Sequence, residues 1–167
     1  MNDFYSDLKY SHKQEDNEIW NVVYSRAFPN MVSFNSVRDD GEHQRAGIDR
    51  VIVCSDGRTI KIDEKVRRVD YGDILLEYIS VDTTGAPGWV EKNLLCDYIA
   101  YAVIPSTTCF MLPVVQLQTA WTKNKRSWLE KYGTRSAKNN GYNTLNCPVP
   151  VNVLFSAIGQ CLRLNWS

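Results

Sequence analysis

The stretch GIDRVIVCSDGRTIKIDEKVR, residues 47–67, decides how the chain folds. Runs of β-branched residues lie on both sides of Asp56-Gly57, and an Asp-Gly pair between two such runs is a strong β-hairpin signal. We expect one strand over Ile48–Cys54, a turn over Ser55–Arg58 and a second strand over Thr59–Arg67. Charged side chains are uncommon in strands and are seldom buried without a partner, so the acids and bases of this hairpin require an explanation.

The charged residues of the hairpin converge at the end away from its turn. Side chains alternate across a strand, so Asp63 and Lys65 share one face of the second strand, whereas Glu64 lies on the other face among Ile60, Ile62 and Val66. A hairpin centred on Asp56-Gly57 brings Asp49 opposite the region from Asp63 to Lys65. We therefore predict two carboxylates and a lysine at one place on the sheet.

Two carboxylates beside a lysine are groups that phosphodiester hydrolysis requires. Mg²⁺ is held by one or two carboxylates together with phosphate oxygens and water. The metal polarises the phosphoryl group and helps to generate hydroxide from its bound water. A nearby lysine orients or deprotonates the nucleophile and stabilises the charge of the transition state.

The segments Gly-Ile-Asp and Ile-Asp-Glu-Lys, joined by a hairpin turn, resemble the Asp…(Asp/Glu)-x-Lys signature of the PD-(D/E)XK nuclease superfamily. The resemblance implies that Asp49 is the first acid, Asp63 the second and Lys65 the lysine. Either Asp63 or Glu64 fits as the second metal ligand, and strand alternation favours Asp63. No proline precedes Asp49, and the Gln-x-x-x-Tyr motif of the exonuclease-like branch is absent.

The resemblance also implies a fold, a cofactor and a substrate. The restriction-endonuclease-like core consists of a helix, a three-stranded β-meander, a second helix and another strand. The implied cofactor is Mg²⁺ or Mn²⁺, and the implied partner is nucleic acid, with DNA preferred over RNA. Members often carry a glutamate on the first helix facing the metal; here Glu15 is the better candidate and Glu18 the other. Many members dimerise to cut two strands, and the sequence leaves the oligomeric state open.

The remaining elements predict an α/β fold with a mixed sheet flanked by helices. We expect a helix over residues 13–27 and a long helix over Val114–Tyr132, which starts after Pro113 and ends before Gly133. A further helix should follow Pro150, a short one should run up to Leu95, and residues 134–144 should form a polar loop. The other strands are expected over residues 31–37, 73–80, 96–104 and 109–113. One domain should span residues 1–167, with a nuclease-like core over about 13–112 and a basic, helical C-terminal part over about 113–167.

Residues 121–140 form the most basic segment of a chain whose formal net charge is zero. Its cations could follow a nucleic-acid backbone, in contacts that are independent of sequence and sensitive to salt. The alternative is a solvated helix and loop. The candidate nucleic-acid-binding residues are Lys123, Lys125, Arg126, Lys131, Arg135 and Lys138.

Composition excludes several classes of protein. The five cysteines are odd in number and contain no Cys-x-x-Cys pair, which favours neither a zinc site nor a disulfide framework and suits a reducing cytoplasm. The N-terminus is polar and acidic, so we expect no signal peptide. No apolar run approaches the roughly 18 residues that a membrane span requires. The compact size suits a phage-borne or mobile-element enzyme.

Each candidate residue also has a structural alternative. Asp63 and Lys65 could form an exposed ion pair, Asp49 could end a strand at the surface, and Glu64 could pair with Arg50 rather than bind metal. Trp89 could stack on a base, although core packing is the more common role of a tryptophan. A non-catalytic module that binds nucleic acid or protein on the same scaffold is therefore the main alternative function, and an interaction protein without phosphate chemistry is a third. What separates them is whether Asp49, Asp63 and Lys65 share one concave site.

Overall fold

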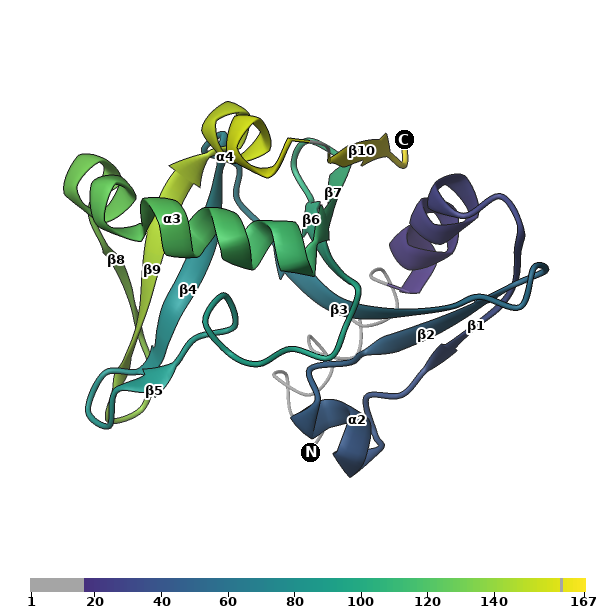
Figure 1. Ribbon diagram of the computed structural model, residues 1–167, viewed down its shortest axis with the longest axis horizontal. Coiled ribbons are helices and arrows are strands. Elements are labelled where there is room, and N and C mark those ends of the chain that lie inside the picture. The colour runs from purple at the N-terminus through teal and green to yellow at the C-terminus, as the bar shows by residue number, and fades with distance from the viewer. Residues whose placement is uncertain (1–16, 160) are drawn as a thin grey trace, which may run out of the picture.

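Two β-sheets form the frame of the molecule (Figure 1). The structure is a computed structural model that describes residues 17–159 and 161–167. The first sheet has the strand order β1 (Met31–Ser36), β2 (Arg50–Cys54), β3 (Thr59–Arg67), β6 (Tyr98–Val103), β7 (Thr108–Pro113) and β10 (Leu162–Asn165). The second sheet has the order β5 (Ala86–Pro87), β4 (Asp73–Val81), β9 (Asn143–Pro150) and β8 (Arg135–Lys138).

Four helices accompany the sheets in the described residues. The first covers residues 17–27, and the others are α2 (Gly41–Arg45), α3 (Val114–Tyr132) and α4 (Val151–Ile158). The long helix matches the bounds that Pro113 and Gly133 predict. Within the described part of the chain, no helix is both long and apolar enough to cross a membrane.

The six-stranded sheet has an apolar cluster on each face. On β6, Ile99, Tyr101 and Val103 pack into the cluster shared with the second sheet, α3 and α4. The alternate residues Ala100 and Ala102 pack into the other cluster, beneath the first helix. That helix contributes the buried side chains Trp20, Val23 and Tyr24. Strand alternation therefore divides the molecule into layers on either side of this sheet.

The hairpin predicted for residues 48–67 is confirmed. Strands β1, β2 and β3 pair in antiparallel order, and β2 pairs with β3 from Arg50 opposite Ile62 to Val53 opposite Thr59. Gly57 occupies the left-handed region of the turn at φ 82°, a conformation that glycine adopts without strain. The Asp49 amide donates to the Ile62 carbonyl at 2.8 Å, so the ladder continues and places Asp49 opposite Asp63.

The connection from β3 to β6 differs from the expected core. These two strands pair in parallel, but the chain between them passes through β4 and β5 of the second sheet and contains no helix. The short helix expected up to Leu95 is wrong, because the backbone after β5 is held to β4 instead. Gly88 donates to the Tyr78 carbonyl at 3.0 Å and Val90 donates to the Glu77 carbonyl at 3.1 Å. The α/β class with a mixed sheet is confirmed, whereas the restriction-endonuclease-like core stays a prediction.

The C-terminal part contains more strand than its sequence suggests. The polar loop expected over residues 134–144 is wrong: β8 and the start of β9 form a hairpin there, with Lys138 opposite Asn143. All four residues of β8 are exposed, so this edge strand lacks the apolar alternation by which a strand is recognised. Strand β10 follows α4 and pairs with the edge of β7. The C-terminal part is therefore both helical and sheet-forming.

Gly88 provides a test of how the segment after β5 is held. A Cβ atom at this position would lie 2.2 Å from the Glu77 carbonyl oxygen. We predict that Gly88→Ala lowers the free energy of unfolding by about 1–3 kcal/mol, because the added methyl forces two backbone segments apart. Urea denaturation measures the change. Gly41→Ala is the matched control, since its Cβ would meet only the Arg45 guanidinium at 3.7 Å; equal stability of the two variants would contradict this packing.

Candidate functional site

Asp49, Asp63 and Lys65 line one open pocket. Asp49 lies directly before β2, and Asp63 and Lys65 lie on β3. The Lys65 ammonium donates to Asp63 Oδ1 at 2.8 Å, and the Asp49 carboxylate is near enough to raise the pKa of Asp63. The pocket has a volume of about 610 Å³. The structure thus brings together the three residues that the hairpin pattern singles out.

Asp63 is a buried acid rather than a member of an exposed ion pair. Its side chain is 6% exposed, compared with 26% for Asp49 and 31% for Lys65. Burial raises the pKa of the Asp63 carboxyl to about 6, and the neighbouring Asp49 carboxylate adds to this shift while Lys65 opposes it. Burial of a charged carboxylate is unfavourable, and a bound cation would offset this cost.

One hydrogen bond and one ion pair orient the Asp49 carboxylate. Its Oδ2 accepts from the Glu64 backbone amide at 2.8 Å, and its Oδ1 lies 3.2 Å from Arg38 Nε. Sequence reasoning missed Arg38, which follows β1 in a polar loop and belongs to no periodic pattern. Its position depends on the pairing of β1 with β2.

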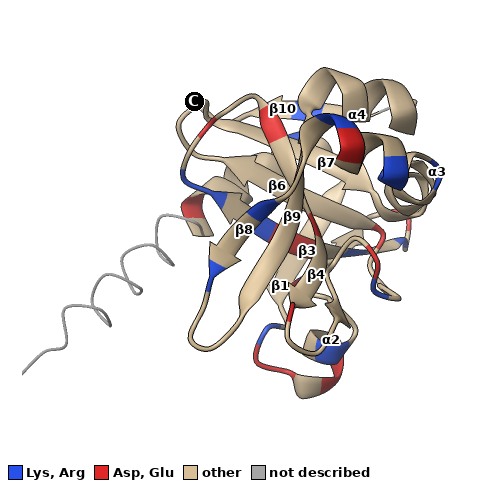
Figure 2. Cartoon of the chain, turned by 90° about the vertical axis from the view of Figure 1, so that its left-hand side faces the viewer, with Lys and Arg blue, Asp and Glu red and all other residues tan. Residues whose placement is uncertain are grey.

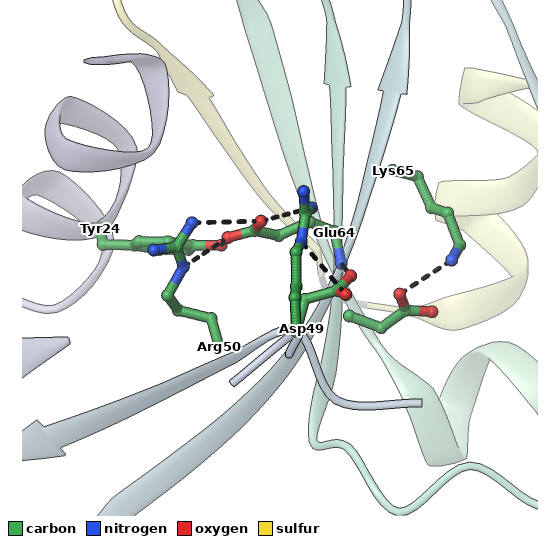
Figure 3. A network of polar contacts seen from close by, with 7 residues as sticks. Tyr24, Asp49, Arg50, Glu64 and Lys65 are labelled. Atoms are coloured by element: carbon green, nitrogen blue, oxygen red, sulfur yellow. Dashed lines mark hydrogen bonds and ion pairs between the residues drawn. The ribbon is translucent and has the colours of Figure 1, made fainter. Parts of the chain in front are cut away.

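Glu64 points toward Tyr24 and Arg50, in a polar network that Arg38 joins to Asp49 (Figure 3). Its side chain is fully buried at 0% exposure. Oε1 accepts from the Tyr24 hydroxyl at 2.6 Å and from Arg50 Nε at 2.9 Å, and Oε2 accepts from Arg38 Nη2 at 2.7 Å. The predicted pairing of Glu64 with Arg50 is confirmed. With its oxygens satisfied in this way, Glu64 leaves Asp63 as the carboxylate that faces the pocket from β3.

Of the two glutamates expected on the first helix, only Glu18 falls within the described residues. Glu15 lies outside the described residues. Glu18 is exposed, and the described part of the helix packs through Tyr24 over the sheet face that carries Glu64. Residues 17–27 therefore pack on the sheet face that carries Glu64 and do not line the pocket.

The wall opposite the acids comes from the segment after β5. Trp89, Lys92, Asn93 and Leu94 line the pocket on this side, and Gln44 and Arg45 line it at the end of α2. Trp89 is 7% exposed and belongs to the apolar core, so it packs in the core and offers no free face for stacking.

Hydrogen bonds hold this wall to two other elements. The Leu95 amide donates to the Ala46 carbonyl at 3.1 Å, and Gln118 of α3 donates to the Lys92 carbonyl at 2.7 Å. Glu91 accepts from the Trp121 indole at 2.9 Å and pairs with Lys125. The shape of the pocket is thus built into the fold.

None of the six basic residues predicted to bind nucleic acid lines this pocket. Three are paired within the fold: Lys125 with Glu91, Arg126 with Glu130 and Arg135 with Asp73. Lys123, Lys131 and Lys138 are exposed. Figure 2 shows Lys and Arg positions interspersed with Asp and Glu positions on the face it presents. Of the six, only Lys125 lines the neighbouring hollow that shares Lys92 and Asn93 with the pocket.

Asp49 and Asp63 are the residues that could hold a divalent cation. Across residues 17–159 and 161–167, no group of three or more His, Cys, Asp or Glu side chains is arranged to bind a metal. Mg²⁺ needs only one or two protein carboxylates when phosphate oxygens and water complete its shell. A two-carboxylate site therefore fits a metal that arrives with a phosphorylated substrate.

Comparisons with protein-family models, with curated proteins and with solved structures found no match to this chain. The function is therefore inferred from the pocket itself.

The raised pKa of Asp63 predicts a dependence of stability on pH. Between its ordinary pKa of 3.8 and the folded value of about 6, the folded protein binds more protons than the unfolded chain, so stability falls as the pH rises through this window. Asp63→Asn removes the buried charge and should stabilise the protein at about pH 8 by about 2–3 kcal/mol, with the gain disappearing near about pH 4. Urea denaturation across this range measures the effect. A variant less stable than the wild type at every pH would contradict the assignment, and Asp56→Asn in the exposed turn is the control.

The Glu64 network predicts a large effect of truncation. Glu64→Ala leaves Arg50, itself buried at 6% exposure, without its carboxylate, and should lower the free energy of unfolding by about 3–5 kcal/mol. Glu130→Ala removes an exposed partner of Arg126 and should change it by less than about 1 kcal/mol. Equal effects of the two substitutions, measured by urea denaturation, would argue against a buried network.

Proposed function

We propose that this protein is a metal-dependent nuclease that hydrolyses phosphodiester bonds with a site of the PD-(D/E)XK type. The convergence of Asp49, Asp63 and Lys65 in one pocket carries the proposal. These are the residue types that bind a divalent cation and stabilise a phosphoryl transition state.

The side chains of the pocket would take separate roles. Asp49 and Asp63 would hold Mg²⁺ or Mn²⁺, which when bound polarises the phosphoryl group and lowers the pKa of water. Lys65 would exchange its contact with Asp63 for one with the substrate phosphate or the attacking water. Arg38 and the Glu64 amide keep Asp49 in its orientation, so that this carboxylate needs little rearrangement when a metal binds.

The fold supports the family assignment in part. The first helix, the antiparallel meander β1–β2–β3 and the parallel strand β6 occur in the order that the superfamily core requires. Two features depart from that core: the connection from β3 to β6 carries strands instead of a helix, and the described part of the first helix faces Glu64 instead of Asp63.

One observation favours a second candidate function. Asp49 is paired with Arg38 and Asp63 with Lys65, so the charges of the pocket are compensated without a metal. A pocket of this kind could bind nucleic acid without cutting it. Metal-dependent cleavage distinguishes the two functions.

The test is an assay of the purified protein with single-stranded and double-stranded DNA and RNA in the presence of Mg²⁺ or Mn²⁺. We predict metal-dependent cleavage that Asp49→Asn, Asp63→Asn and Lys65→Ala each reduce by about 100-fold or more, as expected when a group that stabilises the transition state is removed. Asp63→Asn is informative because this variant should be at least as stable as the wild type at neutral pH.

Asp56→Asn and Lys61→Ala are the matched controls, because both residues belong to the same hairpin but are exposed and do not line the pocket. Both controls should retain wild-type cleavage. Cleavage that survives Asp63→Asn and Lys65→Ala at the wild-type rate would refute this site, and absence of cleavage with every substrate would favour the binding function.

A further inference from the structure

Two cations of the pocket remain outside its ion pairs. Four basic side chains line the pocket: Arg38, Arg45, Lys65 and Lys92. Arg38 and Lys65 are engaged with acidic side chains. Among the residues that the structure describes, Arg45 and Lys92 form no ion pair, and both are exposed. These two cations are free to bind an anion that enters the pocket.

Arg45 and Lys92 stand on different walls. Arg45 ends α2, which follows β1, and Lys92 belongs to the segment that follows β5 in the second sheet. The hydrogen bond from the Leu95 amide to the Ala46 carbonyl ties these walls together next to Arg45, and the bond from Gln118 fixes the backbone at Lys92. Each cation also has an exposed amide neighbour that lines the pocket, Gln44 beside Arg45 and Asn93 beside Lys92.

The depth of Asp63 limits what can reach it. Its carboxylate is only 6% exposed, in a pocket whose volume of about 610 Å³ lies in the range of small-molecule sites, about 300–1,000 Å³. A DNA duplex is broader than a pocket of this size, since its major groove alone is about 12 Å wide. A phosphate of a flexible single strand can enter a recessed pocket of this kind, whereas the phosphates of a duplex lie along a stiff rod with a persistence length of about 150 base pairs.

We infer that the pocket takes a single nucleic-acid strand, whose phosphates Arg45 and Lys92 bind on either side of the phosphate that reaches Asp63 and Lys65. The inference rests on the proposed function for the identity of the central phosphate. On this inference the nucleic-acid backbone follows the rim of the pocket and not the basic segment around α3 and β8. Gln44 and Asn93 supply neutral hydrogen-bonding groups for sugars or bases at the same two places.

The test measures binding without metal, so that it is independent of cleavage. Fluorescence anisotropy in EDTA compares a short single-stranded DNA, the RNA of the same sequence and the DNA duplex of the same length. The double variant Arg45→Ala/Lys92→Ala is compared with Lys123→Ala/Lys138→Ala, which removes two exposed charges elsewhere. Thermal unfolding checks that both double variants are folded. If Arg45→Ala/Lys92→Ala is not folded, the test is repeated with the single variants Arg45→Ala and Lys92→Ala.

We expect the wild type to bind a single strand at least tenfold more tightly than the duplex. Arg45→Ala/Lys92→Ala should weaken single-strand binding by about tenfold or more and should make its slope against the logarithm of salt concentration shallower by about 1.4, because each phosphate contact on a single strand contributes about 0.7. The control variant should bind as the wild type does. A preference between the DNA and RNA strands identifies the sugar and supports the inference in either direction.

Tighter binding of the duplex, equal weakening by the two double variants, or no binding by the wild type would each overturn the inference. The proposed function can fail separately: binding at the pocket rim without metal-dependent cleavage would refute the nuclease and leave the single-strand site standing. Cleavage that depends on Asp63, with binding unaffected by Arg45→Ala/Lys92→Ala, would support the nuclease and refute the single-strand site.

Discussion

The buried carboxylate of Glu64 connects the parts of the molecule on which the site depends. It accepts hydrogen bonds from Tyr24 of the first helix, from Arg50 of β2 and from Arg38 of the loop after β1. The same Arg38 contacts Asp49, and the Glu64 backbone amide donates to Asp49 as well. A carboxylate without these donors would be very unfavourable in the interior, so the helix, the sheet and the orientation of Asp49 are coupled through one residue.

Alternation along β3 separates the side chain that holds the fold together from those that face the pocket. Glu64 points toward the first helix, whereas Asp63 and Lys65 point toward the pocket between the hairpin and the segment after β5. Adjacent residues of one strand thus support the fold and line the pocket without competing for the same partners. The raised pKa of Asp63 indicates that the pocket holds an acid at the expense of stability, as functional sites often do.

The hairpin and its cluster of charges could be predicted from the sequence because both depend on local rules. The Asp-Gly turn sets the register, and a period of two residues places Asp49, Asp63 and Lys65 on one face. Arg38 and Lys92 could not be predicted, since each reaches the pocket from a loop whose position depends on long-range strand pairing. Strand β8 could not be predicted because all its side chains are exposed. The path from β3 to β6 through a second sheet could not be predicted either, because no local sequence pattern indicates it.

The proposed chemistry requires Asp49 and Asp63 to hold a divalent cation together. Calorimetric titration of Mn²⁺ into the wild-type protein and into Asp49→Asn and Asp63→Asn, at neutral pH and with a short single strand present, tests it most directly. We predict that Mn²⁺ binds to the wild type, that the strand strengthens this binding, and that both variants lose it. Binding that is unchanged in the two variants, or no binding to the wild type with the strand present, would contradict this prediction.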